Sequence, residues 1–400
     1  MLDKRIEADR RMIRMYEQIY SNINSNRDSI KLIHNRINNM KQEIKEVNIC
    51  LLVDDIEYIL QSIDYLEVSY KYALGLVNDK YRSFFTFSTF YRAIINTISI
   101  LQEKLYEIIK KNRIIDEDVL KFQNRAEILM KKQKEWRNRI EHDIDPFYCG
   151  EHQDILDNLS ISKVVEFINI FIELISKLNK CIIKTTSLKK INIECEIIEL
   201  KDRKSIIHNS SEIFERLSEL IIELNYICEK RLLNRKEKIL FDLGIKVKEL
   251  HSLLGNIYIK ENIKQEKIYK YFMRIAIVIY YQIFDKIGYY LNDELSLGLE
   301  KNKKYFKEVE KAIESKDLVC KELIFEDEAY GQIRILRQCL IHNKSKFIDY
   351  KNDWEKLTSL IVFDYERIQK IIYGFFKDYG IVASERAKNE LKRKIEYTRL

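Results

Sequence analysis

The chain has 400 residues, of which 46% are apolar and 33% are charged, and its formal net charge is +7. This balance excludes a globally disordered chain, and the length exceeds what one core usually serves, so we expect two domains. One proline and nine glycines leave few helix breakers, which favours an all-helical fold. The positive charge favours polyanionic partners but does not by itself indicate nucleic-acid binding.

The sequence gives no sign of export or of membrane insertion. Its longest apolar runs, such as Ile275 to Phe284, are far shorter than the roughly 20 residues that span a bilayer. The N-terminal stretch is charged throughout and shows no secretory signal. Seven scattered cysteines without a C-x-x-C pair are typical of reduced thiols. We therefore expect a cytoplasmic protein with no membrane partner.

Helical periodicity predicts a series of helices in the first half of the chain. The first is charged, covers residues 1–45 and is broken near Ser21–Ser29. The others cover residues 47–77, the apolar stretch Phe90–Lys111, the polar stretch Asp116–Trp136 and the apolar stretch Ser162–Cys181.

The second half follows the same order, which indicates a duplication. An apolar helix is predicted over Tyr271–Leu291, a polar segment over residues 292–327, an apolar helix over Asp353–Phe376 and a basic helix over Ser384–Leu400. Arg92 precedes Glu103 and Lys104 by the same spacings as Arg274 precedes Asp285 and Lys286, at a displacement of 182 positions. We expect two similar helical bundles related by a pseudo-two-fold axis, residues 1–195 and 196–400. The divide falls within Thr185–Asn209, where residues 191–200 could also form a short strand.

One stretch in each half carries an unusual set of polar residues. Glu135 to His152 holds the only proline, two of the six histidines and one of the two tryptophans. The stretch around His342 repeats its residue types at the same spacings, 200 positions later. The two sets are Lys134, Arg137, Asn138 and His142, and Arg334, Arg337, Gln338 and His342.

On a helix, the residues four and eight before each histidine share its face, whereas the arginine five before lies about 140° round. The helix must therefore begin, bend or end within the motif if both groups act on one phosphate. A surface pair between Arg137 and Glu141 is a simpler interpretation, but Ile341 occupies the matching place in the second half. Arg27…His34 and Arg203…His208 lack the basic residue eight before the histidine, so we interpret them as structural.

RNRIEH and RQCLIH resemble the R-x(4–6)-H motif of the HEPN superfamily, whose members are helical bundles. The first match includes the asparagine that often follows the arginine in that family, Asn138; the second has Gln338 there. In the family, two bundles face each other and their motifs form one composite site that cleaves RNA without a metal. The resemblance implies that this chain carries both bundles. It also implies a toxin or antiphage effector, with RNA and an inhibitory partner or a second copy as partners.

The residue types suit this chemistry. Histidines can exchange protons with the ribose 2′-OH and the leaving 5′-oxygen near neutral pH, and Arg137 and Arg337 can stabilise the phosphorane. Asn138 and Gln338 can orient the imidazoles, while Lys134 and Arg334 attract the RNA backbone. The hypothesis is a metal-independent endoribonuclease acting on single-stranded RNA, without cofactors.

Three alternatives stay open. A zinc site could use the ligands between His142 and His152, although their spacing matches no common zinc pattern. A non-catalytic RNA-binding or protein-interaction module could use the aromatic and basic segment Tyr70–Arg92, although these aromatic residues are more simply a core. The chain could also be a plain helical scaffold.

Overall fold

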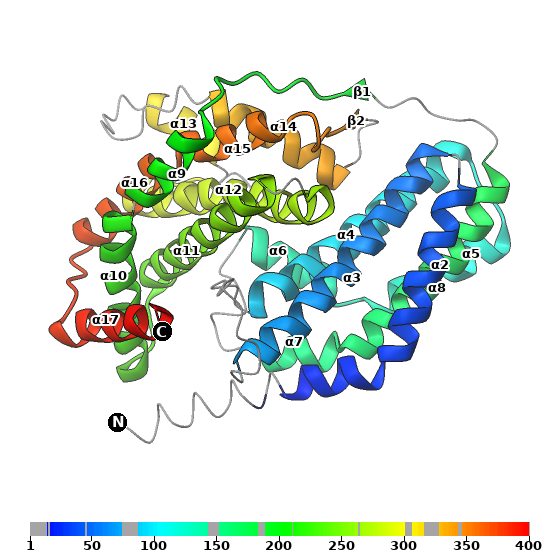
Figure 1. The fold of residues 1–400 in the computed structure, drawn as a ribbon, viewed down its shortest axis with the longest axis horizontal. Helices are drawn as coiled ribbons and strands as arrows, with labels where there is room; N and C mark the ends of the chain where they lie inside the picture. Colours follow the sequence, from blue (N-terminus) through cyan, green and yellow to red (C-terminus); the bar gives the residue numbers. More distant parts are fainter. Residues whose placement is uncertain are drawn as a thin grey trace.

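The computed structural model describes most of the chain, and every structural statement below refers to the part it describes. This part comprises residue 14 and residues 17–44, 46–73, 87–142, 152–182, 189–209, 211–262, 265–300, 306–315, 328–342 and 346–399. It is helical nearly throughout (Figure 1), so the predicted all-helical class is confirmed. No helix within these ranges combines the length and the hydropathy needed to cross a bilayer.

The first half consists of helices in the predicted order. Residues 17–25 are helical, and a turn at Asn26 breaks this first segment as expected. The following helices are α2 (Arg27–Glu43), α3 (Val47–Ala73), α4 (Phe87–Asn112), α5 (Glu117–Leu129), α6 (Gln133–His142), α7 (His152–Asn158) and α8 (Ile161–Cys181).

The second half is also helical and contains one minimal sheet. Its helices are α9 (Leu200–Asn209), α10 (Ser211–Lys230), α11 (Arg235–Asn262), α12 (Glu266–Glu294), α13 (Phe306–Ser315), α14 (Glu328–His342), α15 (Trp354–Phe363), α16 (Tyr365–Asp378) and α17 (Glu385–Arg399). The two strands, β1 (Lys189–Lys190) and β2 (Lys346–Phe347), pair in parallel.

Two predicted helices are each broken in two, without glycine or proline. The helix expected over Asp116–Trp136 stops at Leu129, because α5 packs on α8 whereas α6 turns to pack on α4. The helix expected over Asp353–Phe376 breaks at Asp364, whose buried carboxylate accepts hydrogen bonds from Tyr280 Oη at 3.2 Å and from Arg367 at 2.9 Å. Residues 191–199 are extended but form no strand.

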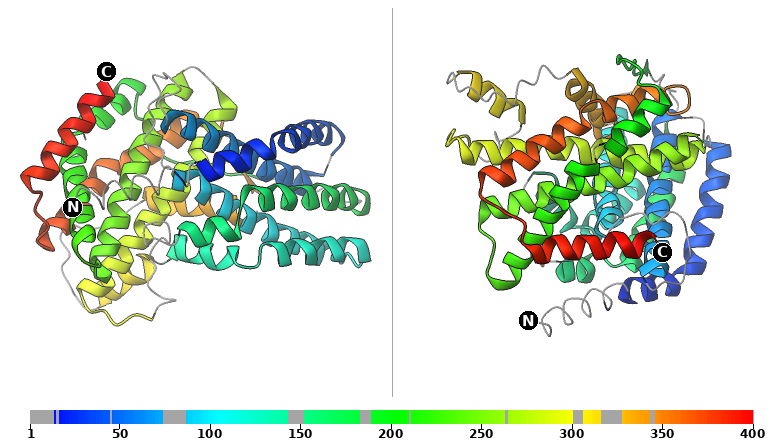
Figure 2. Two further views of the ribbon diagram at one scale, coloured as in Figure 1. Left: turned by 90° about the horizontal axis from the view of Figure 1, so that it is seen from below. Right: turned by 60° about the vertical axis from the view of Figure 1, so that its left-hand side comes forward.

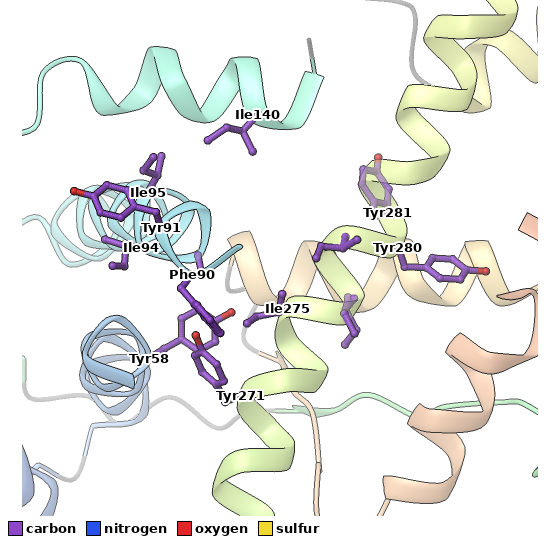
Figure 3. Close-up of a cluster of buried hydrophobic side chains, with 14 of the residues drawn as sticks. Tyr58, Phe90, Tyr91, Ile94, Ile95, Ile140, Tyr271, Ile275, Tyr280 and Tyr281 are labelled. Atoms are coloured by element: carbon purple, nitrogen blue, oxygen red, sulfur yellow. The ribbon is translucent and has the colours of Figure 1, made fainter. Parts of the chain in front are cut away.

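The long helix α12 lies within the second half, packed on α11 and α14, and one end of it faces the helices of the first half (Figures 1 and 2). Its side chains are buried almost all the way round, as expected for a helix enclosed by others. Tyr271 and Ile275 of α12 meet Tyr58 of α3 and Phe90 of α4 in one apolar cluster (Figure 3). The apolar core continues through both halves. Their division into domains 1–195 and 196–400 therefore stays a prediction.

Buried ion pairs cross between the halves at matching places. Asp55 of α3 contacts Arg274 of α12 at 2.6 Å and Lys104 of α4 at 2.7 Å. In the opposite direction, Arg92 of α4 contacts Glu249 of α11 at 2.6 Å. Burial raises the pKa of the Glu249 carboxyl, but Arg92 and Lys246 outweigh it, so the pKa is lowered overall. Each half thus supplies an acid to an arginine of the other.

Replacing Asp55 with asparagine should strongly destabilise the fold, because Lys104 and Arg274 would remain buried without their carboxylate. We expect a loss of about 3–5 kcal/mol in the free energy of unfolding, measured by urea denaturation. Glu166→Gln is the matched control, since Glu166 pairs with Arg125 at 2.9 Å on the surface and should cost less than about 1 kcal/mol. Equal losses in the two variants would contradict a structural role for the buried group.

His251 of α11 is the one histidine with a strongly shifted pKa among the described side chains. Its ring stacks on Phe214 at 4.0 Å, and its Nδ1 lies 2.6 Å from Tyr365 Oη. Burial lowers the pKa of His251 to about 4. The folded state therefore holds this imidazole neutral at pH values where the unfolded chain would protonate it.

Stability should fall as the pH is lowered from about 6.5 to about 4, because over this window the unfolded state binds a proton at His251 that the folded state excludes. The loss should be on the order of 3 kcal/mol, since one pKa unit corresponds to about 1.4 kcal/mol. Urea denaturation across this range should show a shallower pH slope for His251→Gln. His34→Gln, in a half-exposed side chain 3.8 Å from Asp64, is the control and should keep most of the wild-type slope.

Candidate functional site

The helix α6 carries the first motif and packs against α4. Its buried face contains Trp136 and Ile140, and Gln133 Nε2 donates a hydrogen bond to the carbonyl oxygen of Ile95 at 3.0 Å. Ile140 lies above α4, and the end of α6 approaches α12 near Tyr281 (Figure 3). The described part of this helix reaches His142, and the following residues, with Pro146, lie outside the described ranges.

Arg137 faces the interior and not the solvent. Only 6% of it is exposed, and Nη1 donates to Ser99 Oγ at 3.4 Å and to the Glu103 carboxylate. Both partners are on α4. The guanidinium group of Arg137 is therefore buried against α4 and does not form a solvated surface pair.

Arg337 is buried in a corresponding way on α14, where 8% of it is exposed. Its guanidinium carbon lies 4.3 Å from the centre of the Tyr281 ring of α12, a cation–π contact. Burial and the nearby Asp285 carboxylate raise the pKa of Tyr281 to about 12, and Arg337 partly opposes this. Tyr281 is therefore a neutral phenol near pH 7 and is not suited to act as a base.

The two arginines meet matching positions on the preceding long helices. Ser99 and Glu103 lie near Arg137. Tyr281 and Asp285 stand 182 positions after them, the same displacement that relates Arg92 to Arg274. Tyr281 contacts Arg337, and Asp285 and Arg337 both shift the pKa of the Tyr281 phenol, in opposite directions. Each motif arginine thus rests on its own half's long helix at an equivalent site.

The other described motif residues are more exposed than the two arginines. Asn138 is exposed, whereas Arg334 and Gln338 are half-buried. His342 is the last described residue of α14, as His142 is of α6. The side chains of Lys134, His142 and His342 lie outside the described part of the structure. Arg137 is therefore buried while the adjacent Asn138 is exposed, an orientation that the spacing within the motif does not predict.

Each motif helix also reaches the other half. α6 contacts α12 in addition to α4, and α14 contacts α4 in addition to α12. A small cavity of about 30 Å³ lies between α4 and α12, lined by Arg92, Asn96, Arg274 and Gln282 among others. Each of the two motif helices, α6 and α14, therefore packs on both α4 and α12, and we call this crosswise packing.

The other candidates from the sequence are accounted for as far as the structure describes them. Arg27 pairs with Glu67 at 2.7 Å, and Arg203 is 1% exposed, in agreement with structural roles. Within the described ranges, no group of histidine, cysteine and acidic side chains is arranged to hold a metal ion. The proposed zinc ligands between His142 and His152, and most of the aromatic segment Tyr70–Arg92, lie outside those ranges.

Glu103 and Ser99 are the contacts of Arg137 that motif reasoning missed. A signal for the acidic partner was present, since an acidic residue precedes a lysine at matching places in both halves, Glu103–Lys104 and Asp285–Lys286. Comparison with protein-family models, with curated proteins and with solved structures gave no match for this chain.

Glu103→Gln should lower the free energy of unfolding by about 1–2 kcal/mol, because the buried Arg137 would lose its carboxylate. The loss is smaller than for a fully buried pair, since the Glu103 side chain is 37% exposed. Glu107→Gln, one turn further along α4 and exposed, should change stability by less than about 0.5 kcal/mol. Urea denaturation of both variants tests this, and indistinguishable midpoints would contradict the assignment.

Proposed function

We propose that this protein is a metal-independent endoribonuclease that cleaves single-stranded regions of RNA at a composite site built by α6 and α14. The observation that carries the proposal is the crosswise packing, in which α6 contacts α12 and α14 contacts α4. The two motif helices, 200 positions apart in the sequence, thereby pack on the same two helices, α4 and α12. Such packing is what a shared site requires.

The proposed reaction uses the 2′-OH of the RNA as the nucleophile. One of His142 and His342 accepts the 2′-OH proton while the oxygen attacks the phosphorus, and the other donates a proton to the 5′-oxygen as the P–O5′ bond breaks. The products are a 2′,3′-cyclic phosphate and a 5′-OH end. An RNA without the 2′-OH at the scissile position cannot react in this way.

The buried arginines suggest a division of roles. Arg137, held by Ser99 and Glu103, and Arg337, stacked on Tyr281, anchor the helices that end in the histidines and bring positive charge beneath them. The exposed Asn138 and the half-buried Gln338 and Arg334, with Lys134, would contact the phosphate and the imidazoles. In this proposal the two halves are HEPN-like bundles, and the protein acts as a toxin or antiphage effector, by analogy with that family.

The proposal predicts cleavage of single-stranded RNA in excess chelator, with His142→Ala and His342→Ala each lowering the rate by about 10²–10⁴-fold. His34→Ala, in another arginine–histidine pair, is the control and should retain the wild-type rate. Gel analysis of a labelled RNA, with its 2′-deoxy counterpart, gives the readout. Undiminished cleavage by both motif variants, or equal cleavage of the deoxy substrate, would refute the mechanism. RNA that is bound but never cut would indicate the non-catalytic module instead.

A further inference from the structure

A lysine-lined pocket opens at the start of α6, at the opposite end of that helix from His142. It encloses about 160 Å³ between the α5–α6 turn and the junction of α7 with α8. Trp136 and Leu159 are buried in its wall, whereas Lys131 and Lys132 are exposed and Lys163 is half-buried. We call this the α6 pocket.

Hydrogen bonds hold the walls of the α6 pocket in place. Lys163 Nζ donates to the carbonyl oxygens of Asp157 at 3.3 Å and of Asn158 at 3.1 Å, which fixes its ammonium group beside the end of α7. Gln133 is anchored to α4 through the Ile95 carbonyl. Lys132 lies 3.7 Å from the Asp154 carboxylate, too far for a close pair. The pocket is therefore preformed and keeps a positive rim.

The corresponding place in the second half is filled by the protein's own chain. Gln332 of α14 stands 200 positions after Lys132, and Lys356 is the third residue after the α15 N-cap Asp353, as Lys163 is after the α8 N-cap Ser160. The extended residues 191–199 lie across both.

This extended segment contacts both helices through its backbone and one thiol. The backbone N–H of Glu194 donates to Gln332 Oε1 at 2.9 Å, and Gln332 Nε2 donates back to the Glu194 carbonyl oxygen. Cys195 Sγ lies 3.2 Å from the Lys356 carbonyl oxygen. The segment, seen passing over α14 and α15 in Figure 1, also carries Glu196 and Glu199. An extended acidic chain thus occupies the site that is open and lysine-lined in the first half.

We propose that the α6 pocket binds the sugar-phosphate backbone of the RNA strand on one side of the cleaved bond, an inference that rests on the proposed function. A single strand is extended and anionic, as the covering segment is. Lys131 and Lys132 supply positive charge at places where the second half has Gly331 and Gln332. The pocket lies one helix length, about 14 Å, from His142, so it is a few nucleotides from the reacting phosphate. Because its counterpart is covered, only one flank of the RNA is held.

The test measures binding of a fluorescein-labelled oligouridylate to the His142→Ala/His342→Ala protein by anisotropy, across a range of salt concentrations. Lys131→Gln/Lys132→Gln and Lys163→Gln are introduced on this background. Each lost phosphate contact should weaken binding about five-fold at about 0.1 M salt, and should lower the slope of log affinity against log salt by about 0.7. Lys121→Gln on α5, with a side chain that is 73% exposed, is the matched control and should change neither quantity.

Unchanged affinity and slope in the double variant would overturn the subsite, while cleavage by the wild-type protein would leave the proposed function intact. Absence of cleavage by the wild type would instead refute the nuclease, and the binding measurement would still show whether the α6 pocket contacts the RNA. A peptide of residues 189–200 that binds in a lysine-dependent manner, where the oligouridylate does not bind, would assign the pocket to an acidic peptide and would also overturn the proposal. The double variant leaves Lys163 and its hydrogen bonds in place, so its result does not depend on the α7–α8 junction.

Discussion

The arrangement of this molecule depends on the pairing of a few charges that are almost entirely buried. Asp55 forms ion pairs with Lys104 of its own half and with Arg274 of the other half. Glu249 of the second half pairs with Arg92 of the first. Buried pairs add little stability relative to apolar side chains of the same size, but a buried charge without its partner is costly. The main effect is therefore on specificity. A shift of α11 and α12 together relative to α3 and α4 would separate both Arg274 from Asp55 and Arg92 from Glu249, so one relative position of the halves is strongly preferred.

This constraint reaches the candidate site through neighbouring residues. Lys104 anchors α4 to Asp55, and the preceding residue, Glu103, accepts from Arg137. In the second half, Lys286 lies 3.0 Å from Asp242, and the preceding residue, Asp285, acts on the phenol that stacks against Arg337. In each half, the lysine of the long helix thus pairs with a buried carboxylate of the core, and the acidic residue just before it interacts at the contact with the motif helix. Any rotation of α4 or α12 would disturb both, so the geometry at the ends of α6 and α14 is tied to the pairing between the halves.

Much of the fold could be predicted from periodicity, because amphipathic helices of this length leave a clear pattern and the chain has few breakers. The breaks at Met130–Lys132 and Asp364 could not, since they arise from tertiary packing and from a buried carboxylate that binds Tyr280 and Arg367. At the site, helical geometry placed Arg137 on a different face of the helix from His142, but which of these faces is buried depends on the packing of α6 on α4. Its partner Glu103 is 34 positions away on another helix, and a spacing argument within one helix cannot reach it. The covering of α14 by residues 191–199 was equally hidden, because an alternating apolar and acidic stretch is also the pattern of a strand.

The difference between the halves follows from connectivity. In an assembly of two identical chains, any segment that covered one motif helix would cover both. In a single chain, the connection from α8 to α9 occurs once, and its route passes over the start of α14 and leaves the start of α6 open. Glutamine at position 338, where the first half has asparagine at position 138, is a second departure from equivalence, four residues before each histidine. In the proposed nuclease, the open first half would then bind the RNA, and the covered second half would supply the second histidine. The RNA strand would therefore bind with one polarity, and the two histidines would have fixed and distinct roles.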